Sequence, residues 1–419
     1  MASHADVDRC RVCGNPQLDQ LLSLGVQALT GVFPRSREEA VTAGPVDLVK
    51  CAERPGGETC GLVQLRQTYS KDEMYGGGRY GYHSGLNASM VRHLQGKVAD
   101  VLKRVRVGKG DLVVDIGSND CTLLKAYPEN GPDLVGIDPT AEQFRRFYPA
   151  RIELIADFFS ADLLRRRFPG RKAKIVTSIA MFYDLDAPMD FVADVRDSLA
   201  DDGVWIVEQS YLPAMVEANA YDTICQEHLE YYGARQMRWM MERAGLKIVA
   251  IERNAINGGS FSLTIAKKAA PYPECTAELA AFLRAEASYA GPEPYRAFAA
   301  AVARHREELV AFLTRARAEG KTILGYGAST KGNVILQYCG LTAEELPLIG
   351  EVNPDKFGAF TPGTLIPIVP EAEVRSRKPD YLLVLPWHFR DFIVEKEAPY
   401  LRAGGKLVFP LPEMKVVAG

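Results

Sequence analysis

The sequence lacks long apolar runs and any strong excess of charge. No stretch approaches the roughly 18 uninterrupted apolar residues of a membrane-spanning helix, and residues 1–8 contain no apolar core of a secretory signal. Its 50 Lys and Arg against 53 Asp and Glu give a net charge of -3, so the chain as a whole lacks the basic excess of a nucleic-acid binder, which leaves only a local basic patch open. We therefore expect a cytoplasmic protein that binds neither membranes nor nucleic acid.

Compositional bias is also absent. The hydrophobic share of 47% and the charged share of 25% are ordinary for globular chains, which argues against long disorder, collagen-like repeats and coiled coil. A chain of 419 residues exceeds what one hydrophobic core usually organises, at roughly 150 residues per domain. Two or three domains are expected.

Cysteine is scarce, which excludes a disulfide framework, yet half of the eight cysteines precede residue 61. A C-x2-C pair is followed by Gly14, and a later cysteine is followed by Gly61, the residue type that lets backbone amides fold around a thiolate. Four thiolates suit a structural zinc ion; the alternative is four unrelated reduced cysteines. The candidate ligands are Cys10, Cys13, Cys51 and Cys60.

Beyond residue 95, one series of short apolar strands, glycine turns and helical stretches occurs twice. The helical stretches are expected to end near residues 127 and 338. In the matched positions Asp115 becomes Gly325, and Asp138 becomes Asn353, which suggests that the second copy has lost the carboxylates of the first. The paired segments are 110–118 with 320–328, 136–139 with 350–354, 173–184 with 379–389, and 203–208 with 405–409.

Strands that alternate with helices in this way are typical of doubly wound parallel sheets, with ligands at the carboxyl ends of the strands. The sequence thus predicts an α/β protein with two Rossmann-like domains and a small N-terminal zinc-binding domain. We expect boundaries at 1–90, 91–275 and 276–419. The segment 276–319 is rich in Ala, Glu and Arg and predicts two linking helices with a break at 291–294.

In the first copy, a strand ends in Asp115 and a Gly117 turn, and Asp138 closes the next strand. Both NAD-binding and S-adenosylmethionine (SAM)-binding folds place an acidic residue there for the adenosine ribose. A dinucleotide site needs G-x-G-x-x-G, whereas this loop has one glycine and then Asp120, which would repel a phosphate. SAM is the better fit, with an unliganded turn as the alternative. The predicted cofactor-binding residues are Asp115, Gly117, Asn119, Asp138, Asp157 and Phe158.

Several motifs together carry a family resemblance that runs from Cys10 to Pro412. The chain resembles the SAM-dependent C-methyltransferases of nucleotide-linked 4-keto-deoxysugars. That resemblance implies an N-terminal zinc domain, a SAM-binding middle domain and a C-terminal domain of related fold, with the sugar nucleotide between the last two. Besides the cysteines, the motifs are YGYHSGLN (80–87), VDIGSND (114–120), EHLEYY (227–232), NGGS (257–260), GYGASTKG (325–332) and LPWHF (385–389).

Two positions depart from the family pattern. Asp120 is followed by Cys121 where relatives usually have glycine, so a side chain intrudes near the SAM loop. Cys225 and Gln226 stand where relatives carry Tyr or Cys and then His. Hydroxyl groups at the site would then have to come from Tyr80, Tyr231 or Tyr232.

Methylation of a carbon next to a ketone requires a base that is neutral near pH 7, and histidine is the natural candidate. Of the six histidines, His228 is implied by the resemblance as this base, with Glu227 beside it to orient substrate hydroxyls, and Tyr80 is assigned to catalysis. On a helix these two neighbours would point apart. His4, His93 and His305 are expected to be solvated or packed.

The remaining polar residues of these motifs are assigned to the substrate. Lys331 follows a glycine turn and could hold the diphosphate, although a simple packing turn is the alternative. We expect a dTDP- or GDP-linked keto-deoxysugar, methylated at C3, and a monomeric enzyme. The predicted substrate-binding residues are Tyr82, His83, Asn87, Tyr232, Asn257, Lys331, Trp387 and His388.

Two other functions remain open from sequence. One is an NAD-dependent oxidoreductase or epimerase of nucleotide sugars, disfavoured by Asp120 and the missing second glycine. The other is a zinc-containing interaction protein whose Rossmann-like domains have no catalytic activity.

Overall fold

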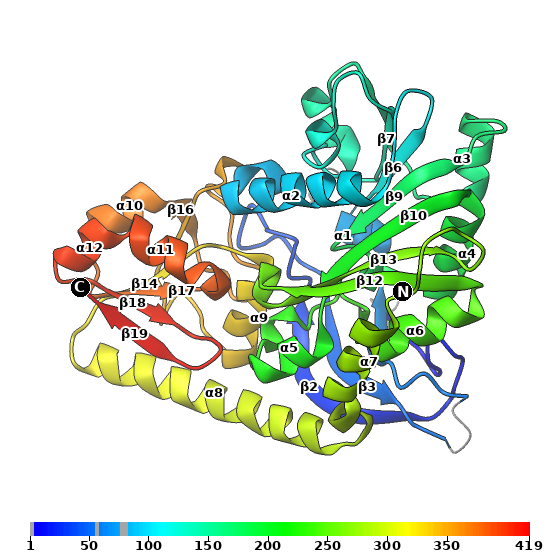
Figure 1. The fold of residues 1–419 in the computed structure, drawn as a ribbon. Coiled ribbons are helices and arrows are strands. Elements are labelled where there is room, and N and C mark those ends of the chain that lie inside the picture. The colour runs from blue at the N-terminus through cyan, green and yellow to red at the C-terminus, as the bar shows by residue number, and fades with distance from the viewer. Residues whose placement is uncertain (1–3, 55–57, 76–82) are drawn as a thin grey trace.

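The computed structural model describes residues 4–54, 58–75 and 83–419, and it contains two α/β lobes joined by a small β module (Figure 1). The lobe at the right of Figure 1 holds the first copy of the repeated pattern, and the lobe at the left holds the second. The fold class predicted from sequence is confirmed. No helix in the part of the chain that the structure describes is long and apolar enough to span a membrane.

The N-terminal module contains an antiparallel four-stranded sheet in the order β11-β4-β3-β2 and a two-stranded β1-β5 ribbon. One of its strands comes from far along the chain: Glu230 of β11 lies opposite Gln64 of β4. The strands are β1 (His4–Asp6), β2 (Leu18–Ala28), β3 (Ala43–Cys51), β4 (Val63–Leu65), β5 (Gln67–Tyr69) and β11 (Glu230–Tyr231).

The middle domain is built on a seven-stranded sheet in the order β12-β13-β10-β9-β6-β7-β8. Six strands run in the same direction, and only β13, between β10 and β12, runs antiparallel to its neighbours. A dinucleotide-binding sheet has the all-parallel order 3-2-1-4-5-6, so the inserted reversed strand argues against an NAD enzyme. The strands are β6 (Leu112–Ile116), β7 (Asp133–Ile137), β8 (Ile152–Ile155), β9 (Ala173–Ile179), β10 (Leu199–Ser210), β12 (Leu246–Asn254) and β13 (Ser260–Lys267).

The C-terminal domain has a six-stranded sheet in the order β16-β15-β14-β17-β18-β19, parallel except for β19. Its interior strands are short, apolar and buried, as parallel strands covered on both faces should be. The strands are β14 (Ile323–Tyr326), β15 (Ile349–Glu351), β16 (Ile368–Pro370), β17 (Tyr381–Val384), β18 (Lys406–Phe409) and β19 (Lys415–Ala418).

Helices cover the sheets and connect the lobes. The predicted linking helices are confirmed as α7 and α8, which are separated near Gly291, and α8 runs beneath both lobes in Figure 1. The helices are α1 (Lys71–Tyr75), α2 (Ala88–Arg104), α3 (Ala161–Arg167), α4 (Pro188–Ser198), α5 (Leu212–Glu217), α6 (Ala234–Arg243), α7 (Thr276–Ala285), α8 (Glu293–Ala318), α9 (Thr330–Cys339), α10 (Glu371–Ser376), α11 (Arg390–Lys396) and α12 (Ala398–Arg402).

The strands of the repeat occur where the sequence predicts them, but the first copy has no α-helix after its glycine turn. Asn119 and Cys121 adopt left-handed φ angles of 46° and 68°, which a right-handed helix cannot include. Only a single 3-10 turn, Leu124–Ala126, follows. The expected helix is therefore wrong for the first copy and right for the second, where α9 forms.

A second correction concerns the carboxylate of the second copy. The Gly117 amide donates to the carbonyl of Ile137, directly before Asp138, and the Gly327 amide donates to Gly350, directly before Glu351. Glu351 is thus the structural counterpart of Asp138, and the sequence match to Asn353 is wrong by two residues. The second copy has kept a carboxylate at this position.

The N-terminal module packs against both lobes. Leu48 and Val63 belong to the same hydrophobic core as the C-terminal sheet, whereas Cys51, Cys60 and Leu62 pack into the core of the middle domain. The domain boundaries at residues 90 and 275 stay a prediction, because the module and the lobes share these cores.

Candidate active site

The four predicted metal ligands converge in the N-terminal module. Their sulfur atoms all lie within 4.8 Å of one another, with 3.4 Å between the Sγ atoms of Cys10 and Cys60 and 3.5 Å between those of Cys13 and Cys51. Gly14 and Gly61 have φ near 70°, the left-handed turn that follows each ligand. Four clustered, largely buried thiols fit a tetrahedral zinc ion, and no position is left for a reacting water.

The zinc module is joined directly to the segment that contains His228. β4 begins three residues after Cys60 and pairs with β11, which begins two residues after His228. The Gln236 side chain also donates to the carbonyls of Cys60 and Gly61, at 3.0 and 3.1 Å. Folding of the metal site thus fixes the backbone on which the predicted base is carried.

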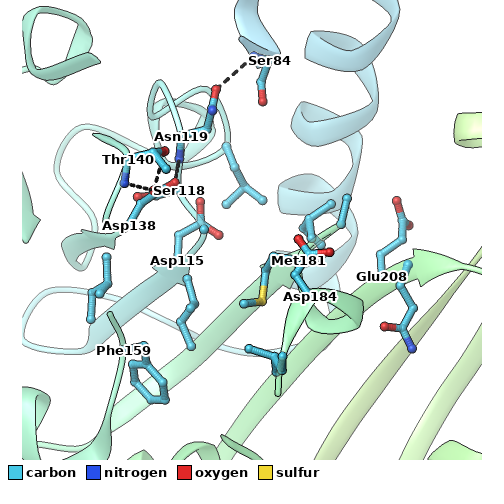
Figure 2. Close-up of a pocket in the computed structure, with 18 of the residues that line it drawn as sticks. Ser84, Asp115, Ser118, Asn119, Asp138, Thr140, Phe159, Met181, Asp184 and Glu208 are labelled. Carbon is cyan, nitrogen blue, oxygen red and sulfur yellow. Dashed lines mark hydrogen bonds between the residues drawn. The ribbon is translucent and has the colours of Figure 1, made fainter. Parts of the chain in front are cut away.

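A cavity of about 410 Å³ opens at the carboxyl ends of β6, β7 and β9 (Figure 2). Its size lies in the range of sites for small organic ligands. Five of the six predicted cofactor-binding residues line it: Asp115, Gly117, Asn119, Asp138 and Phe158.

Two carboxylates shape the cofactor end of the cavity. Asp138 accepts hydrogen bonds from the backbone amides of Asn119, at 2.8 Å, and Thr140, at 2.7 Å, which hold it at the end of β7. Asp115 accepts a hydrogen bond from the Thr177 hydroxyl. Burial raises the pKa of Asp115 to about 7, against the effect of Thr177. Both carboxylates are thus fixed at the ends of their strands, and the binding of ribose hydroxyls by Asp138 stays a prediction.

The segment after residue 82 covers the cofactor loop. The Ser84 amide donates to the Asn119 side chain at 3.1 Å (Figure 2), and the Gly85 amide donates to Asp120 at 2.7 Å. The His83 ring lies 2.7 Å from the same Asp120 carboxylate. His83, which we predicted to bind substrate, therefore contacts the cofactor loop.

Asp157 does not line this cavity. Its side chain is exposed and accepts a hydrogen bond from the neighbouring amide of Phe158. Phe158 lines the cavity but is 51% exposed, and Phe159 next to it also contributes to the wall. The geometry allows an aromatic ring at this position to contact the cofactor, whereas cofactor binding by Asp157 receives no support.

The opposite end of the cavity carries two acidic residues that the sequence reasoning missed. Asp184 follows β9, and its Oδ1 atom is buried without a hydrogen-bond partner among the described residues. Burial raises the pKa of Asp184 well above its ordinary value, and nearby Glu227 adds to this shift. Figure 2 shows Asp184 and Glu208 across the cavity from Asp138. The sequence does contain a signal for both residues, because each is a polar residue near the carboxyl end of a predicted strand.

Glu208 is held by a network from α2. It contacts His93 and Lys97, the latter at 2.8 Å, and accepts a hydrogen bond from Asn254 at 2.9 Å. Burial opposes ionisation, yet His93 and Lys97 hold the pKa of Glu208 below its ordinary value. His93, expected to be solvated or packed, in fact supports a wall of the cavity.

His228 lies in a turn and not on a helix. One ring nitrogen, Nδ1, is 2.7 Å from the carbonyl oxygen of Thr223 and must donate to it, which leaves Nε2 as an acceptor. Its ring meets Tyr183 edge-on at 4.4 Å. Burial, together with the charge of Lys331, lowers the pKa of His228 to about 4. The imidazole is therefore neutral at pH 7 with a free lone pair.

The carboxyl group of Glu227 lies against Gly31 of the N-terminal module. A Cβ atom on Gly31 would lie 2.2 Å from Glu227 Oε1, so a larger residue at position 31 would displace this carboxyl group. Burial raises the pKa of Glu227 to about 7, while Lys356 opposes the shift. Lys356 donates to the Ala328 carbonyl at 2.9 Å and was not anticipated.

Four predicted substrate residues meet where the two lobes join. Lys331 Nζ donates to the carbonyl of Asn257 at 3.1 Å, and Asn257 itself lines the cofactor cavity. Trp387 Nε1 donates to Asp222 at 2.8 Å. Burial and the charge of Lys331 lower the pKa of His388 to about 3. The structure thus brings Asn257, Lys331, Trp387 and His388 together beside His228.

The other predicted substrate residues are elsewhere. Asn87 caps helix α2, where its side-chain oxygen accepts from the amides of Ser89 and Met90. Tyr232 is fully buried against Phe182 in the core of the middle domain. Tyr80 and Tyr82 lie outside the described residues. The helix cap accounts for Asn87, and the core position accounts for Tyr232, in both cases without a ligand.

Comparison with known proteins agrees with the layout of the chain. Residues 10–75 match a zinc binding domain model, residues 90–251 a methyltransferase domain model, and residues 255–412 a model of the C-methyltransferase C-terminal domain. The C-methyltransferase NovU of Streptomyces niveus is 30% identical over 417 residues, which cover 98% of this chain and 97% of that protein.

Solved structures share part of the fold. A SAM-dependent methyltransferase from Clostridium acetobutylicum is 9% identical and covers 42% of this chain and 92% of its own, with a TM-score of 0.34. The glycopeptide N-methyltransferase MtfA, in complex with SAM, is 12% identical and covers 41% of this chain and 93% of its own, with a TM-score of 0.32. Both likenesses extend over less than half of this chain.

The reversed strand, the single-glycine loop and the acidic residue after β7 define a SAM-dependent methyltransferase with a Rossmann-like sheet. Its cysteine cluster is the structural zinc site of the N-terminal module. The similarity to a C-methyltransferase along the whole chain identifies the family: this chain belongs to the C-methyltransferases.

Proposed function

We propose that the enzyme methylates C3, next to the C4 ketone, of a dTDP- or GDP-linked 4-keto-deoxysugar. The observation that carries this proposal is the neutral imidazole of His228, whose Nε2 is free to accept a proton near the cofactor cavity. A carbon next to a ketone becomes nucleophilic only after it loses a proton, and a base with these properties can remove it.

SAM, when bound, supplies a methyl group that its sulfonium already activates. Asp138 would accept the ribose hydroxyls, and the Gly117 turn would admit the ligand close to the backbone. Uptake of the substrate proton by His228 leaves the electron pair on carbon and the ketone oxygen. The carbon then forms its bond to the methyl group as the bond to sulfur breaks. The Thr223 carbonyl holds the ring during both steps.

Residues at the junction of the lobes would bind the sugar nucleotide. Asn257, Lys331, Trp387 and His388 are proposed as substrate contacts because they surround the same region as His228. Glu227 is proposed to orient a substrate hydroxyl, which its half-buried carboxyl group permits. Catalytic use of Tyr80 and substrate contact by Tyr82 stay predictions from sequence.

The test is incubation of the enzyme with SAM and a panel of dTDP- and GDP-linked 4-keto-deoxysugars, read by mass spectrometry. We expect the gain of one methyl group, placed by NMR on the carbon next to the ketone. The matched control is the same sugar after reduction of the ketone to an alcohol, which should not react. Methylation of the reduced sugar, or of none of the panel, would refute the proposal.

A further inference from the structure

Lys331 connects the C-terminal domain to the methyl-donor site of the middle domain. It lies in the first turn of α9, after Ser329 caps that helix. Its ammonium group donates to the carbonyl of Asn257, in the turn between β12 and β13 that lines the cofactor cavity. In Figure 1, α9 lies beside the ends of these two strands. The ammonium therefore contacts a residue of the cavity wall and is half-buried, although Lys331 itself is not among the lining residues.

This ammonium has unused hydrogen-bonding capacity. Among the described residues, the Asn257 carbonyl is its only hydrogen-bond acceptor, although an ammonium carries three donors. Asp222 is the nearest source of negative charge, but Lys331 forms no ion pair with it within the described structure, and the Asp222 carboxylate instead accepts from Trp387. Burial lowers the pKa of Lys331. Donors left free in a half-buried position are available to a ligand.

The loop around Lys331 is poorly built to hold a diphosphate. A Cβ atom on Gly327 would lie 2.6 Å from Pro386, and one on Gly332 would lie 2.7 Å from Leu385. These glycines are thus explained by close packing, and the Ser329 hydroxyl already accepts from the Gly332 amide. The packing turn, the simpler of the two sequence interpretations, accounts for the loop without a phosphate.

A chain of contacts connects Lys331 to the proposed base. Lys331 donates to Asn257, and a Cβ atom on the adjacent Gly258 would lie 3.3 Å from Trp387. Trp387 donates to Asp222, whose neighbour Thr223 holds the His228 ring. In agreement with this geometry, the charge of Lys331 contributes to the lowered pKa of both His228 and His388. Removal of a proton next to a ketone moves negative charge to the ketone oxygen, and a fixed cationic donor at that oxygen stabilises the transition state. A neutral base and an ammonium group are the two groups that such a reaction needs.

We propose that Lys331 donates a hydrogen bond to the ketone oxygen of the substrate and stabilises the enolate that forms when His228 takes the proton. This inference rests on the proposed function. The C–H bond breaks toward His228 Nε2, its electron pair moves to the ketone oxygen, and that pair returns to carbon as the methyl group arrives. Lys331 keeps its own proton throughout. Its role is therefore catalytic, because it contacts the reacting atoms.

The test compares Lys331→Met and Lys331→Arg with the wild type and with Lys396→Met, a lysine of the same domain that pairs with Glu371 and does not line the cavity. Each variant is assayed for methylation. Each is also assayed for deuterium exchange at the carbon next to the ketone, in heavy water with S-adenosylhomocysteine. We expect Lys331→Met to lower kcat and exchange together by about a hundred- to a thousandfold, the usual cost of losing one such donor. SAM affinity should persist, and Lys331→Arg should recover part of the rate.

Two further readouts separate chemistry from folding. Small alkylammonium ions should raise the rate of Lys331→Ala, and the acid limb of its pH profile should move to higher pH, because the charge that lowers the pKa of His228 is gone. A raised KM for the nucleotide sugar with unchanged kcat and exchange would assign Lys331 to the diphosphate and overturn the inference alone. A wild-type enzyme that methylates no keto sugar would overturn the proposed function, and this inference with it.

Discussion

The two Rossmann-like copies share the glycine and the carboxylate at their strand ends but differ in the loops that follow. In each, a glycine amide at the end of the first strand donates to the residue before a carboxylate, Asp138 in one and Glu351 in the other. Each carboxylate then accepts a backbone amide of the loop, from Asn119 and Ala328 respectively. This shared glycine and carboxylate arrangement alone therefore does not decide whether a ligand binds.

The loops after the glycine make the difference. In the first copy, Asn119 and Cys121 take left-handed angles, no α-helix follows, and a cavity of about 410 Å³ remains. In the second, α9 starts at once, Pro386 packs against Gly327, and the N-terminal module lies across the strand ends. The Asn333 side chain there donates to the Thr30 carbonyl at 2.7 Å. One copy is kept open for a ligand, and the other is filled by its own chain.

Removal of zinc should have the largest effect, because the zinc module covers the second copy and pairs with the strand after His228. Structural zinc contributes about 10–16 kcal/mol in zinc-finger peptides, so Cys10→Ser with Cys60→Ser should unfold this module. We expect loss of bound zinc by metal analysis and faster hydrogen exchange in β4, β11 and the start of α9. Cys275→Ser, outside the cluster, should keep one zinc per chain. Full zinc retention in the double variant would show that these thiols are not the ligands.

Replacing two buried histidines, one at a time, should separate a catalytic role from a structural one. Burial lowers the pKa of both His228 and His305 to about 4, but His305 lies on α8 and contacts Tyr221. His228→Asn should reduce methylation by about a hundred- to ten-thousandfold with both ligands still bound, since a positioned base is lost. His305→Asn should lower the melting temperature and leave the rate nearly intact. A near-normal rate in His228→Asn would move the role of base to another group.

The pH profile gives an independent check on His228. The active form is the neutral ring, and its pKa lies below the ordinary value of 6.5, so the base stays competent as pH falls from 8 to 5. We expect the acid limb of kcat/KM near pH 4, followed by loss of rate below it. An acid limb near 6.5 that disappears in His228→Asn would mean that the ring is solvated when substrate binds.

Matched substitutions of the two carboxylates should give a smaller effect. Asp138→Ala should weaken SAM binding by about ten- to a hundredfold, or roughly 1.5 to 3 kcal/mol, through loss of charge-assisted hydrogen bonds. Glu351→Ala should leave SAM affinity unchanged but destabilise the C-terminal domain, because the amides of Ala328, Val352 and Asn353 lose their acceptor. Calorimetric titration and urea denaturation measure the two effects. Equal losses of SAM affinity would erase the distinction between the copies.

Alanine substitutions in the two glycine turns should show the smallest difference, which is one of stability. Gly117 and Gly327 have φ of 74° and 81°, so alanine at either position costs about 1–3 kcal/mol of stability. Gly327→Ala should lie at the upper end, because its Cβ would meet Pro386 at 2.6 Å, whereas Gly117→Ala meets only the flexible Met181 side chain at 3.0 Å. Only Gly117→Ala should also weaken SAM binding. Identical midpoints in urea would contradict the packing argument.

Much of this protein could be predicted from the order of its residues. The two series of strands, the break near Gly291 in the linking helices and the four metal ligands follow from short patterns of apolar residues, glycine and cysteine. Such patterns reflect strand burial and turn geometry, which depend on neighbouring residues in the sequence. They can therefore be recognised without knowledge of the tertiary structure.

The tertiary structure decided the rest. Glu351, and not Asn353, matches Asp138, because a backbone hydrogen bond sets the register of the two copies. Asp184, Glu208 and the partner of Lys331 became visible only when the strand ends and the two lobes came together. Asn87 has the composition of a ligand contact and serves as a cap. A side chain's chemistry can be read from sequence, but many of its partners come from segments distant in the sequence, and those contacts fix its burial, its charge state and its role.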